Sequence, residues 1–75
     1  MDHDTEDVKD EIVLGVVEEA LPNALFRVKI DTSDQLVLAY LSGRMRKFRI
    51  RVLVGDTVGM IMDPYGGKAR ITKRI

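Results

Sequence analysis

The chain has 75 residues, of which 45% are hydrophobic and 32% are charged, and it contains no Cys. A chain of this length forms one small domain that buries only about 60% of the surface its unfolded form exposes, which excludes a deep cleft between lobes. Without Cys there is neither a disulfide framework nor a thiolate metal site. No apolar run approaches the roughly 20 residues that cross a bilayer, and the acidic N-terminus is unlike a signal peptide. We therefore expect a cytosol-like protein without a membrane segment.

The net charge is zero, but the two signs are separated along the chain. Residues 1–43 carry ten acids and three bases, hence a net charge of −7, and residues 44–75 carry nine bases and two acids, hence +7. Charge asymmetry between halves indicates a polyanionic partner. The alternative is that the two halves interleave in the fold and neutralise each other.

The chain divides into an N-terminal tail and a barrel domain. Residues 1–11 contain six acids, one base and almost nothing apolar, so they cannot bury enough surface to offset the entropy lost on ordering. We expect residues 1–11 to be disordered or loosely attached. Residues 12–75 are the predicted domain.

Two strands are predicted in the first half of this domain. The run 12–17 is β-branched and apolar, and Gly15 in its middle predicts a bulge or a sharp bend. Pro22 and Asn23 predict a turn over 21–24. Residues 25–30 then alternate strictly, with Phe26 facing the core, which is typical of a half-buried strand.

Three further strands and one helical connection follow. A polar turn at 31–34 precedes a strand over 36–41, and a turn at 55–56 precedes a strand over 57–62. After a loop over 63–67, Ala69 and Ile71 mark a fifth strand. Between these parts the alternation fails after Ser42, which can cap a helical turn. Arg44, Lys47 and Arg51 fall at i, i+3 and i+7, which predicts a short helical connection with a basic face.

These elements predict an all-β fold. The expected architecture is a five-stranded Greek-key barrel with a short helical turn between strands three and four, and an SH3-like barrel is the main alternative. Closure is expected because an open sheet in so small a chain would leave bare edges. With only four aromatic residues, the core must be mostly Val, Ile, Leu and Met.

The residues for catalysis are scarce. His3 is the only imidazole, and it lies in the predicted tail, away from any fixed acid, base or metal site. Asp56 follows Gly and Asp63 precedes Pro, so both are interpreted as turn residues. Gly66 and Gly67 lack the helix of a phosphate-binding loop. We therefore expect no enzyme, no metal and no cofactor.

The basic residues carry the strongest functional signal. Five bases lie within residues 44–51, and Lys and Arg bind phosphates with release of counterions. Met45 and Phe48 lie among these basic residues, and such hydrophobic side chains either contact nucleobases of the RNA or plug the end of the barrel. Arg70 and Arg74 are predicted on one outward face of the fifth strand, with Lys68 in register and Lys73 on the other side.

RNA is the expected ligand of these residues. Tyr40 precedes the basic connection, where an exposed ring would stack on an unpaired base for roughly 1–3 kcal/mol, and the alternative for it is the core. Duplex DNA is disfavoured because the chain offers no long recognition helix and only one Asn and one Gln. The candidate RNA-binding residues are Tyr40, Arg44, Met45, Arg46, Lys47, Arg49, Arg51, Lys68, Arg70 and Arg74.

Three segments resemble bacterial translation initiation factor one: LPNALFRV at 21–28, SGRMRK at 42–47 and IRVLVGD at 50–56, followed by Pro64 and Tyr65. The resemblance runs roughly from Gly15 to Arg74. It implies a non-catalytic OB-fold barrel that binds the aminoacyl site of the small (30S) ribosomal subunit. It further implies contacts with small-subunit rRNA and a neighbouring ribosomal protein, occlusion of tRNA, and cooperation with initiation factors two and three.

The resemblance also assigns residues. The family's rRNA-contacting basic connection falls on Arg44, Met45, Arg46, Lys47 and Arg51, and its basic final strand falls on Arg70. The chain departs from the family pattern at Tyr40, where His is common, at Phe48-Arg49, and in a shorter loop after Tyr65. Because plastid relatives often carry Tyr at the first of these positions, we expect either a bacterial cytoplasm or a plastid stroma.

Two alternative functions are retained. One is a general single-stranded RNA binder or chaperone of cold-shock type, although such sheets present several aromatic residues and this chain has four in all. The other is a protein-interaction barrel whose basic segment meets an acidic partner. In each case we expect a monomer that does not bind membranes.

Overall fold

The structure is a computed structural model, and it describes residues 11–63 and 65–75. The interpretations of residues 1–10, His3 among them, lie outside these residues. The described elements are β1 (Ile12–Leu21), the 3₁₀ turn η1 (Pro22–Ala24), β2 (Leu25–Ile30), β3 (Leu36–Leu41), α2 (Gly43–Lys47), β4 (Thr57–Ile61) and β5 (Ala69–Arg74). The five predicted strands and the helical turn between the third and the fourth are confirmed.

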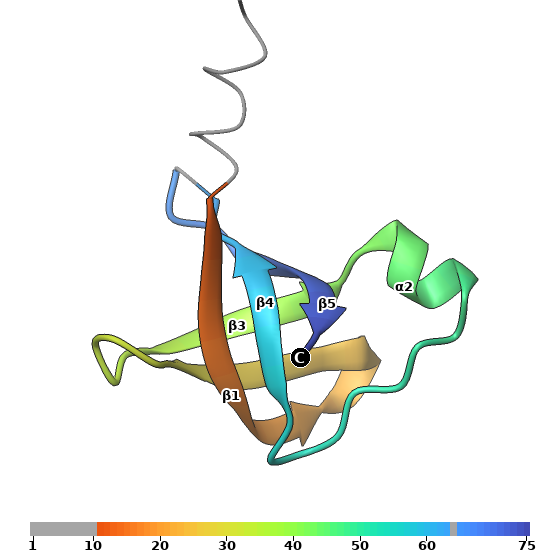
Figure 1. Cartoon of the computed structure of the whole chain (residues 1–75), viewed down its shortest axis with the longest axis horizontal. Helices are drawn as coiled ribbons and strands as arrows, with labels where there is room; N and C mark the ends of the chain where they lie inside the picture. The colour runs from red at the N-terminus through yellow and green to blue at the C-terminus, as the bar shows by residue number, and fades with distance from the viewer. Residues whose placement is uncertain (1–10, 64) are drawn as a thin grey trace, which may run out of the picture.

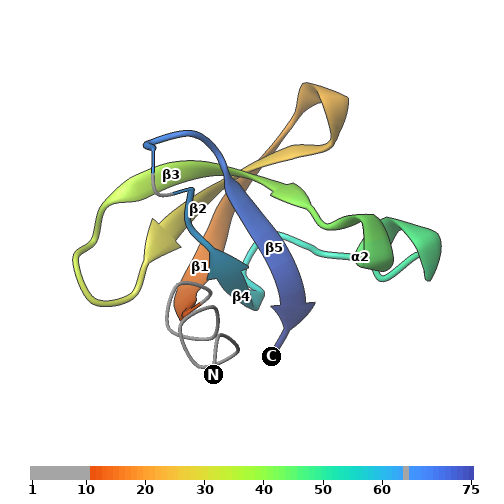
Figure 2. The same ribbon diagram turned by 90° about the horizontal axis from the view of Figure 1, so that it is seen from above.

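The strands close into a barrel in the order β1-β2-β3-β5-β4 (Figure 1). All neighbouring strands run antiparallel except β3 and β5, which pair in parallel through Ala39–Ala69, Tyr40–Arg70 and Leu41–Ile71. This parallel pair closes the barrel, so no long edge of the sheet is left bare. Figures 1 and 2 place α2 at one end of the barrel and the β2–β3 loop at the opposite end.

The two halves of β1 pair with different strands. Residues 12–16 pair with β4 and residues 15–21 pair with β2, so β1 crosses from one side of the barrel to the other. The register shifts between Val17 and Glu19 and not at Gly15, so the bulge predicted as one possibility at Gly15 was wrong. Gly15 serves a close approach instead, because a Cβ there would lie 2.7 Å from Val28 Cγ1 and 2.8 Å from the carbonyl oxygen of Lys29.

The β1–β2 hairpin confirms the turn predicted at 21–24. Asn23 and Ala24 adopt left-handed backbone angles, with φ of 65° and 60°. Asn tolerates this region better than most residues. The ring of Pro22 fixes its own φ, at the position just before Asn23.

The core is mostly Val, Ile and Met, as predicted, but the Leu residues predicted with them are not among its buried members. β2 gives the clearest pattern, because Phe26, Val28 and Ile30 are buried and the residues between them are exposed. The buried hydrophobic residues are Val17, Phe26, Val28, Ile30, Ala39, Met45, Val52, Val58, Met60, Ala69 and Ile71.

A second register shift lies in the pairing of β4 with β5. Met60 pairs with Ile71 and Gly59 pairs with Lys73, so Thr72 is the extra residue of a bulge. Because Met60 is buried, its neighbour Gly59 faces outward, and Lys73 lies beside it on the outer surface. The bulge thus brings Lys73 to the side of β5 that carries Arg70, and Arg74, which pairs with the buried Val58, falls on the other side. The prediction that Arg70 and Arg74 share an outward face, with Lys73 on the opposite side, was therefore wrong.

Candidate nucleic-acid interface

The start of α2 is fixed to the barrel by Ser42. Its Oγ accepts a hydrogen bond from the backbone N–H of Met45 at 3.2 Å, which is the predicted N-cap. Its own N–H donates to the carbonyl oxygen of Ile71 in β5 at 2.9 Å. The helix therefore begins where β3 and β5 close the barrel.

The two hydrophobic residues of the basic segment have different positions. Met45 is only 1% exposed and fills the end of the barrel, whereas Phe48 is 62% exposed, with its ring centroid 5.8 Å from Nζ of Lys47. The sequence allowed both positions for each residue. Because the side chain of Met45 is enclosed by the core, a direct contact with RNA bases does not fit it. Its role here is to anchor α2.

The end of α2 is a Schellman motif. Ile50 donates its N–H to the carbonyl oxygen of Met45 at 2.9 Å, and Arg49 donates to that of Arg46 at 3.2 Å. Arg49 occupies the left-handed position of this motif with φ of 55°, where glycine is usual. The helix thus ends at Lys47, so the prediction that Arg51 shares one helical face with Arg44 was wrong.

Arg51 lies in the extended segment between α2 and β4, which several hydrogen bonds hold against the barrel. Val17 accepts from the N–H of Gly55 at 2.8 Å and donates to the carbonyl oxygen of Asp56 at 2.9 Å. The Asp56 carboxylate accepts from the N–H of Leu53 at 2.8 Å. Nη1 of Arg74 donates to the carbonyl oxygen of Arg51 at 3.0 Å, so β5 also holds this segment.

Both aspartates interpreted as turn residues are engaged in this way. Besides the bond made by Asp56, the Asp63 carboxylate accepts from the N–H groups of Tyr65 at 2.9 Å and Gly67 at 3.1 Å. Among the described residues, no three His, Cys, Asp or Glu side chains are grouped as metal ligands would be. Nor does the described part of the chain contain a helix long and apolar enough to cross a membrane.

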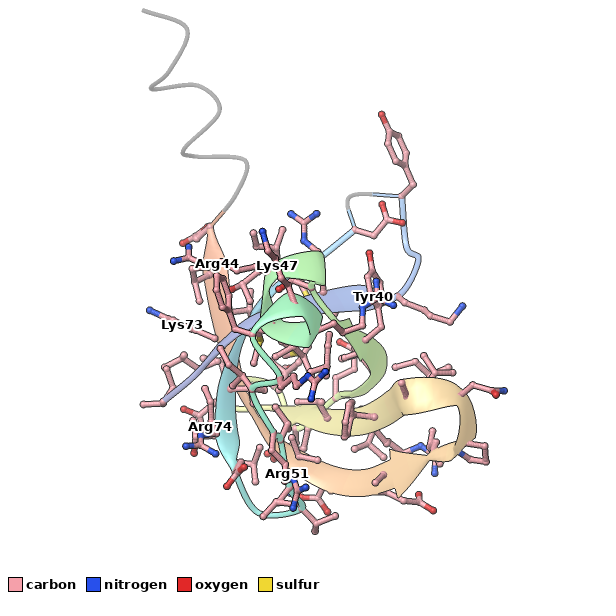
Figure 3. All side chains as sticks on the ribbon, turned by 90° about the vertical axis from the view of Figure 1, so that its right-hand side faces the viewer. Tyr40, Arg44, Lys47, Arg51, Lys73 and Arg74 are labelled. Carbon is pink, nitrogen blue, oxygen red and sulfur yellow. The ribbon has the colours of Figure 1, made fainter. Side chains whose placement is uncertain are left out.

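Several of the exposed basic residues gather around α2 on one face of the molecule. Arg44 and Lys47 lie on the helix, Arg51 on the segment that follows, and Lys73 and Arg74 beside them at the end of β5 (Figure 3). A surface pocket of about 480 Å³ joins α2 to β5 and is lined by Arg44, Met45, Ile50, Thr72, Lys73 and Arg74. We call the following residues the basic face: Arg44, Arg46, Lys47, Arg49, Arg51, Lys73 and Arg74.

The other candidate residues lie outside this set. Tyr40 is 37% exposed on the outer surface of β3, on the far side of α2 from Lys73, and it pairs in register with Arg70 (Figure 3). Its ring is therefore not a core residue. Lys68 is exposed in the loop before β5, where it lines a different pocket together with Leu36 and Leu38. Lys73 was absent from the candidate residues because the Thr72 bulge has no signal in the sequence.

The charge separation seen in the sequence persists in space. The ion pairs among the described residues are Arg27–Glu19 at 2.7 Å and Lys29–Asp34 at 3.8 Å, and all four partners belong to residues 1–43. Within residues 11–63 and 65–75, no base of the second half forms a salt bridge. The alternative was that the two halves interleave and neutralise each other. Their strands do pair, β1 with β4 and β3 with β5, but no ion pair joins the halves among the described residues.

Residues 2–75 match the model of the protein family described as translation initiation factor 1A / IF-1. The chain belongs to this family. IF-1 proteins are translation factors without catalytic activity, which confirms the prediction that the chain is no enzyme.

Solved structures agree with the IF-1 assignment. The chain is 35% identical to the translation initiation factor IF-1 of the Wolbachia endosymbiont strain TRS of Brugia malayi, with a TM-score of 0.73, and the match covers 95% of this chain and 87% of that one. The predicted OB-fold is thereby confirmed over the SH3-like alternative.

Two larger proteins share the fold alone. YjeQ from Thermotoga maritima matches with a TM-score of 0.74 and 22% identity over 87% of this chain, and the circularly permuted GTPase YloQ matches with a TM-score of 0.74 and 21% identity over 92%. The present chain covers 23% of the length of YjeQ and 24% of that of YloQ. At these identities the similarity carries no inference about activity.

Proposed function

We propose that this IF-1 family chain binds the aminoacyl site of the small (30S) ribosomal subunit through rRNA and thereby keeps tRNA out of that site. Its further partners would be a neighbouring small-subunit ribosomal protein and initiation factors two and three. It acts as a monomer, without a cofactor, in a bacterial cytoplasm or a plastid stroma. The observation that carries the proposal is that a well-fixed backbone presents the basic side chains of α2 and its flanking residues, none of which pairs with a carboxylate of the described residues.

This mounting matters because binding costs less when the contacting groups are already ordered. Met45 in the core, the Ser42 cap and the Schellman motif fix the helix backbone, and Arg74 fixes the segment that follows. The basic side chains are then free to contact phosphates, with release of counterions. Steric occlusion follows from the bulk of the barrel behind them and requires no chemical step.

Two exposed aromatic rings add a way to contact unpaired bases. Tyr40 and Phe48 lie at the surface near α2, at 37% and 62% exposure. Stacking of a base on an aromatic ring contributes about 1–3 kcal/mol and needs no particular base identity. Of the candidate residues, Met45 is left out of the proposed contacts because it is buried.

The test is binding of the labelled protein to purified 30S subunits over a series of salt concentrations. An Arg46→Ala/Lys47→Ala variant removes two bases of the basic face. The matched control, Arg27→Ala/Lys29→Ala, removes two exposed bases of β2, whose surface ion pairs contribute little to stability.

We expect the wild type to saturate one site, with a log–log salt slope of about −2 to −4 for three to five phosphate contacts. The basic-face variant should bind more weakly with a shallower slope, and the β2 control should bind like the wild type. Equal binding to many sites on free single-stranded RNA would instead favour the cold-shock-type function. Binding to neither would favour an acidic protein partner, and either result overturns the proposal.

A further inference from the structure

The basic face has no carboxylate partner among the described residues, although the chain as a whole is neutral. Of the described acids, Glu18, Asp31 and Asp34 surround a surface pocket of about 240 Å³ together with Lys29, Glu19 pairs with Arg27, and Glu11 precedes β1. The β2–β3 loop that carries two of them is at the opposite end of the barrel from α2 (Figures 1 and 2). The negative charge that makes the whole chain neutral therefore lies outside residues 11–75.

Residues 1–10 supply it. They contain five acids and one Lys, so their side chains carry a net charge of −4 with His3 neutral. The acids of this segment are Asp2, Asp4, Glu6, Asp7 and Asp10.

The segment joins the barrel between the basic face and the β2–β3 loop, since Glu11 and Ile12 also line a surface pocket with Asp31 and Thr32. Ile12 and Lys73 flank the same glycine, because a Cβ on Gly59 would lie 3.0 Å from Cγ2 of Ile12 and 3.0 Å from Cγ of Lys73. Lys73 in turn lines one pocket with Arg44 and Arg74. Figure 3 shows the start of β1 on the same side of α2 as Lys73.

The length of the segment is sufficient to reach across this face. A random coil of ten residues has a root-mean-square span of roughly 17 Å, and a short tether gives an effective concentration of about 1 mM at the site. At this concentration the bound state of a segment of charge −4 on a cluster of basic residues is populated at low salt, even if the attraction is weak.

We propose that residues 1–10 are an intramolecular occupant of the basic face, which competes with RNA phosphates for the same bases. The segment lowers the affinity for any RNA that offers only phosphates. An RNA site that adds shape and stacking contacts displaces the segment as well, and the free energy needed to displace it is the same for every RNA. The proposal needs only that the basic face binds polyanions, so it does not depend on the ribosomal function proposed above.

The test uses the full chain with its five tail acids replaced: Asp2→Asn, Asp4→Asn, Glu6→Gln, Asp7→Asn and Asp10→Asn. Binding to an oligouridine of about 20 nucleotides, longer than the site that one OB-fold covers, is measured at several salt concentrations. We expect about 3- to 10-fold tighter binding than the wild type at low salt, as an intramolecular competitor at about 1 mM implies. The salt slope should be steeper, since RNA no longer displaces an anion, and the two curves should converge at high salt.

A matched pair separates occupancy from overall charge. Asp7→Asn/Asp10→Asn and Glu18→Gln/Asp34→Asn change the net charge by the same amount, but the second pair acts at the pocket of Glu18, Lys29 and Asp34 described above. We expect only the first pair to tighten RNA binding. Equal effects of the two pairs would overturn the proposal, because they would show general repulsion of RNA.

A structural readout in the absence of RNA completes the test. In NMR spectra of the wild type and the five-fold variant at low salt, we expect shifted backbone amides at Arg44, Lys73 and Arg74 and unchanged ones at Glu18 and Asp34. Superimposable spectra across the basic face would overturn the proposal. If these spectra differ but 30S binding is absent, the tail inference stands and the ribosomal function fails.

Discussion

Arg74 donates a hydrogen bond from Nη1 to the backbone carbonyl oxygen of Arg51 at 3.0 Å, so one cation of the basic face positions the segment that carries another. A carboxylate in place of this carbonyl would hold the segment as well, but it would cancel a charge. The use of a backbone acceptor keeps both guanidinium groups available for phosphates.

Substitution of Arg74 should separate its charge from its bond. Arg74→Gln removes the charge and keeps a donor, whereas Arg74→Lys keeps the charge. Since the bond is exposed, both variants should unfold within about 1 kcal/mol of the wild type. Only Arg74→Gln should reduce the salt slope of 30S binding, by roughly 0.7–0.9 for one lost phosphate contact. An unchanged slope in Arg74→Gln would show that Arg74 does not contact phosphate.

Met45 should act through burial alone. Met45→Ala leaves a cavity at the end of the barrel and should lower the free energy of unfolding by about 2–5 kcal/mol in urea titrations. Met45→Leu conserves volume and should cost less than about 1.5 kcal/mol. We expect the Leu variant to bind 30S subunits like the wild type. Loss of binding by a stable Met45→Leu protein would mean that Met45 contacts RNA directly.

Substitution of Arg49 by Gly should raise stability and weaken RNA binding. Its left-handed backbone costs a residue with a Cβ about 1 kcal/mol relative to glycine, so Arg49→Gly should raise the free energy of unfolding by about that amount. Arg49→Ala removes the same charge but keeps the Cβ, and its stability should stay near that of the wild type. Both variants should bind RNA more weakly than the wild type, and by the same factor. A Gly variant no more stable than the Ala variant contradicts this account.

Two glycines should respond in opposite ways to a methyl group. At Gly15 a Cβ would press on Val28 and on the backbone of Lys29, so Gly15→Ala should destabilise the barrel by about 1–3 kcal/mol. At Gly43, the first residue of α2, no atom lies within 4 Å of a Cβ, and Gly43→Ala should be neutral or stabilising by up to about 1 kcal/mol. Thermal unfolding of the two variants side by side checks the order.

The strands that the sequence predicted best are those whose burial alternates. In β2 one face is wholly buried and the other is charged, so the period of two is plain in the residues. β1 extends four residues beyond the predicted apolar run, to Leu21, although Glu18, Glu19 and Ala20 are exposed. Pairing with β2 holds these residues in the strand, and backbone pairing leaves no trace in hydropathy.

The bulges escaped the sequence analysis for a related reason. Glu18 and Thr72 are ordinary strand residues, and what makes them extra is the register of partners distant in the chain. The basic residues themselves were found because charge is visible in the sequence. Their exposure is confirmed, and their contacts with RNA stay a prediction.

The closure of the barrel by β5 sets a limit on when the domain can fold during its own synthesis. β5 pairs with both β3 and β4, and it follows them in the chain. Until β5 has left the ribosome, β3 and β4 each expose an unpaired edge, and the nascent chain holds only a partial sheet. Folding therefore waits for the fifth strand, and a message truncated before it yields an open, aggregation-prone product rather than a weaker factor.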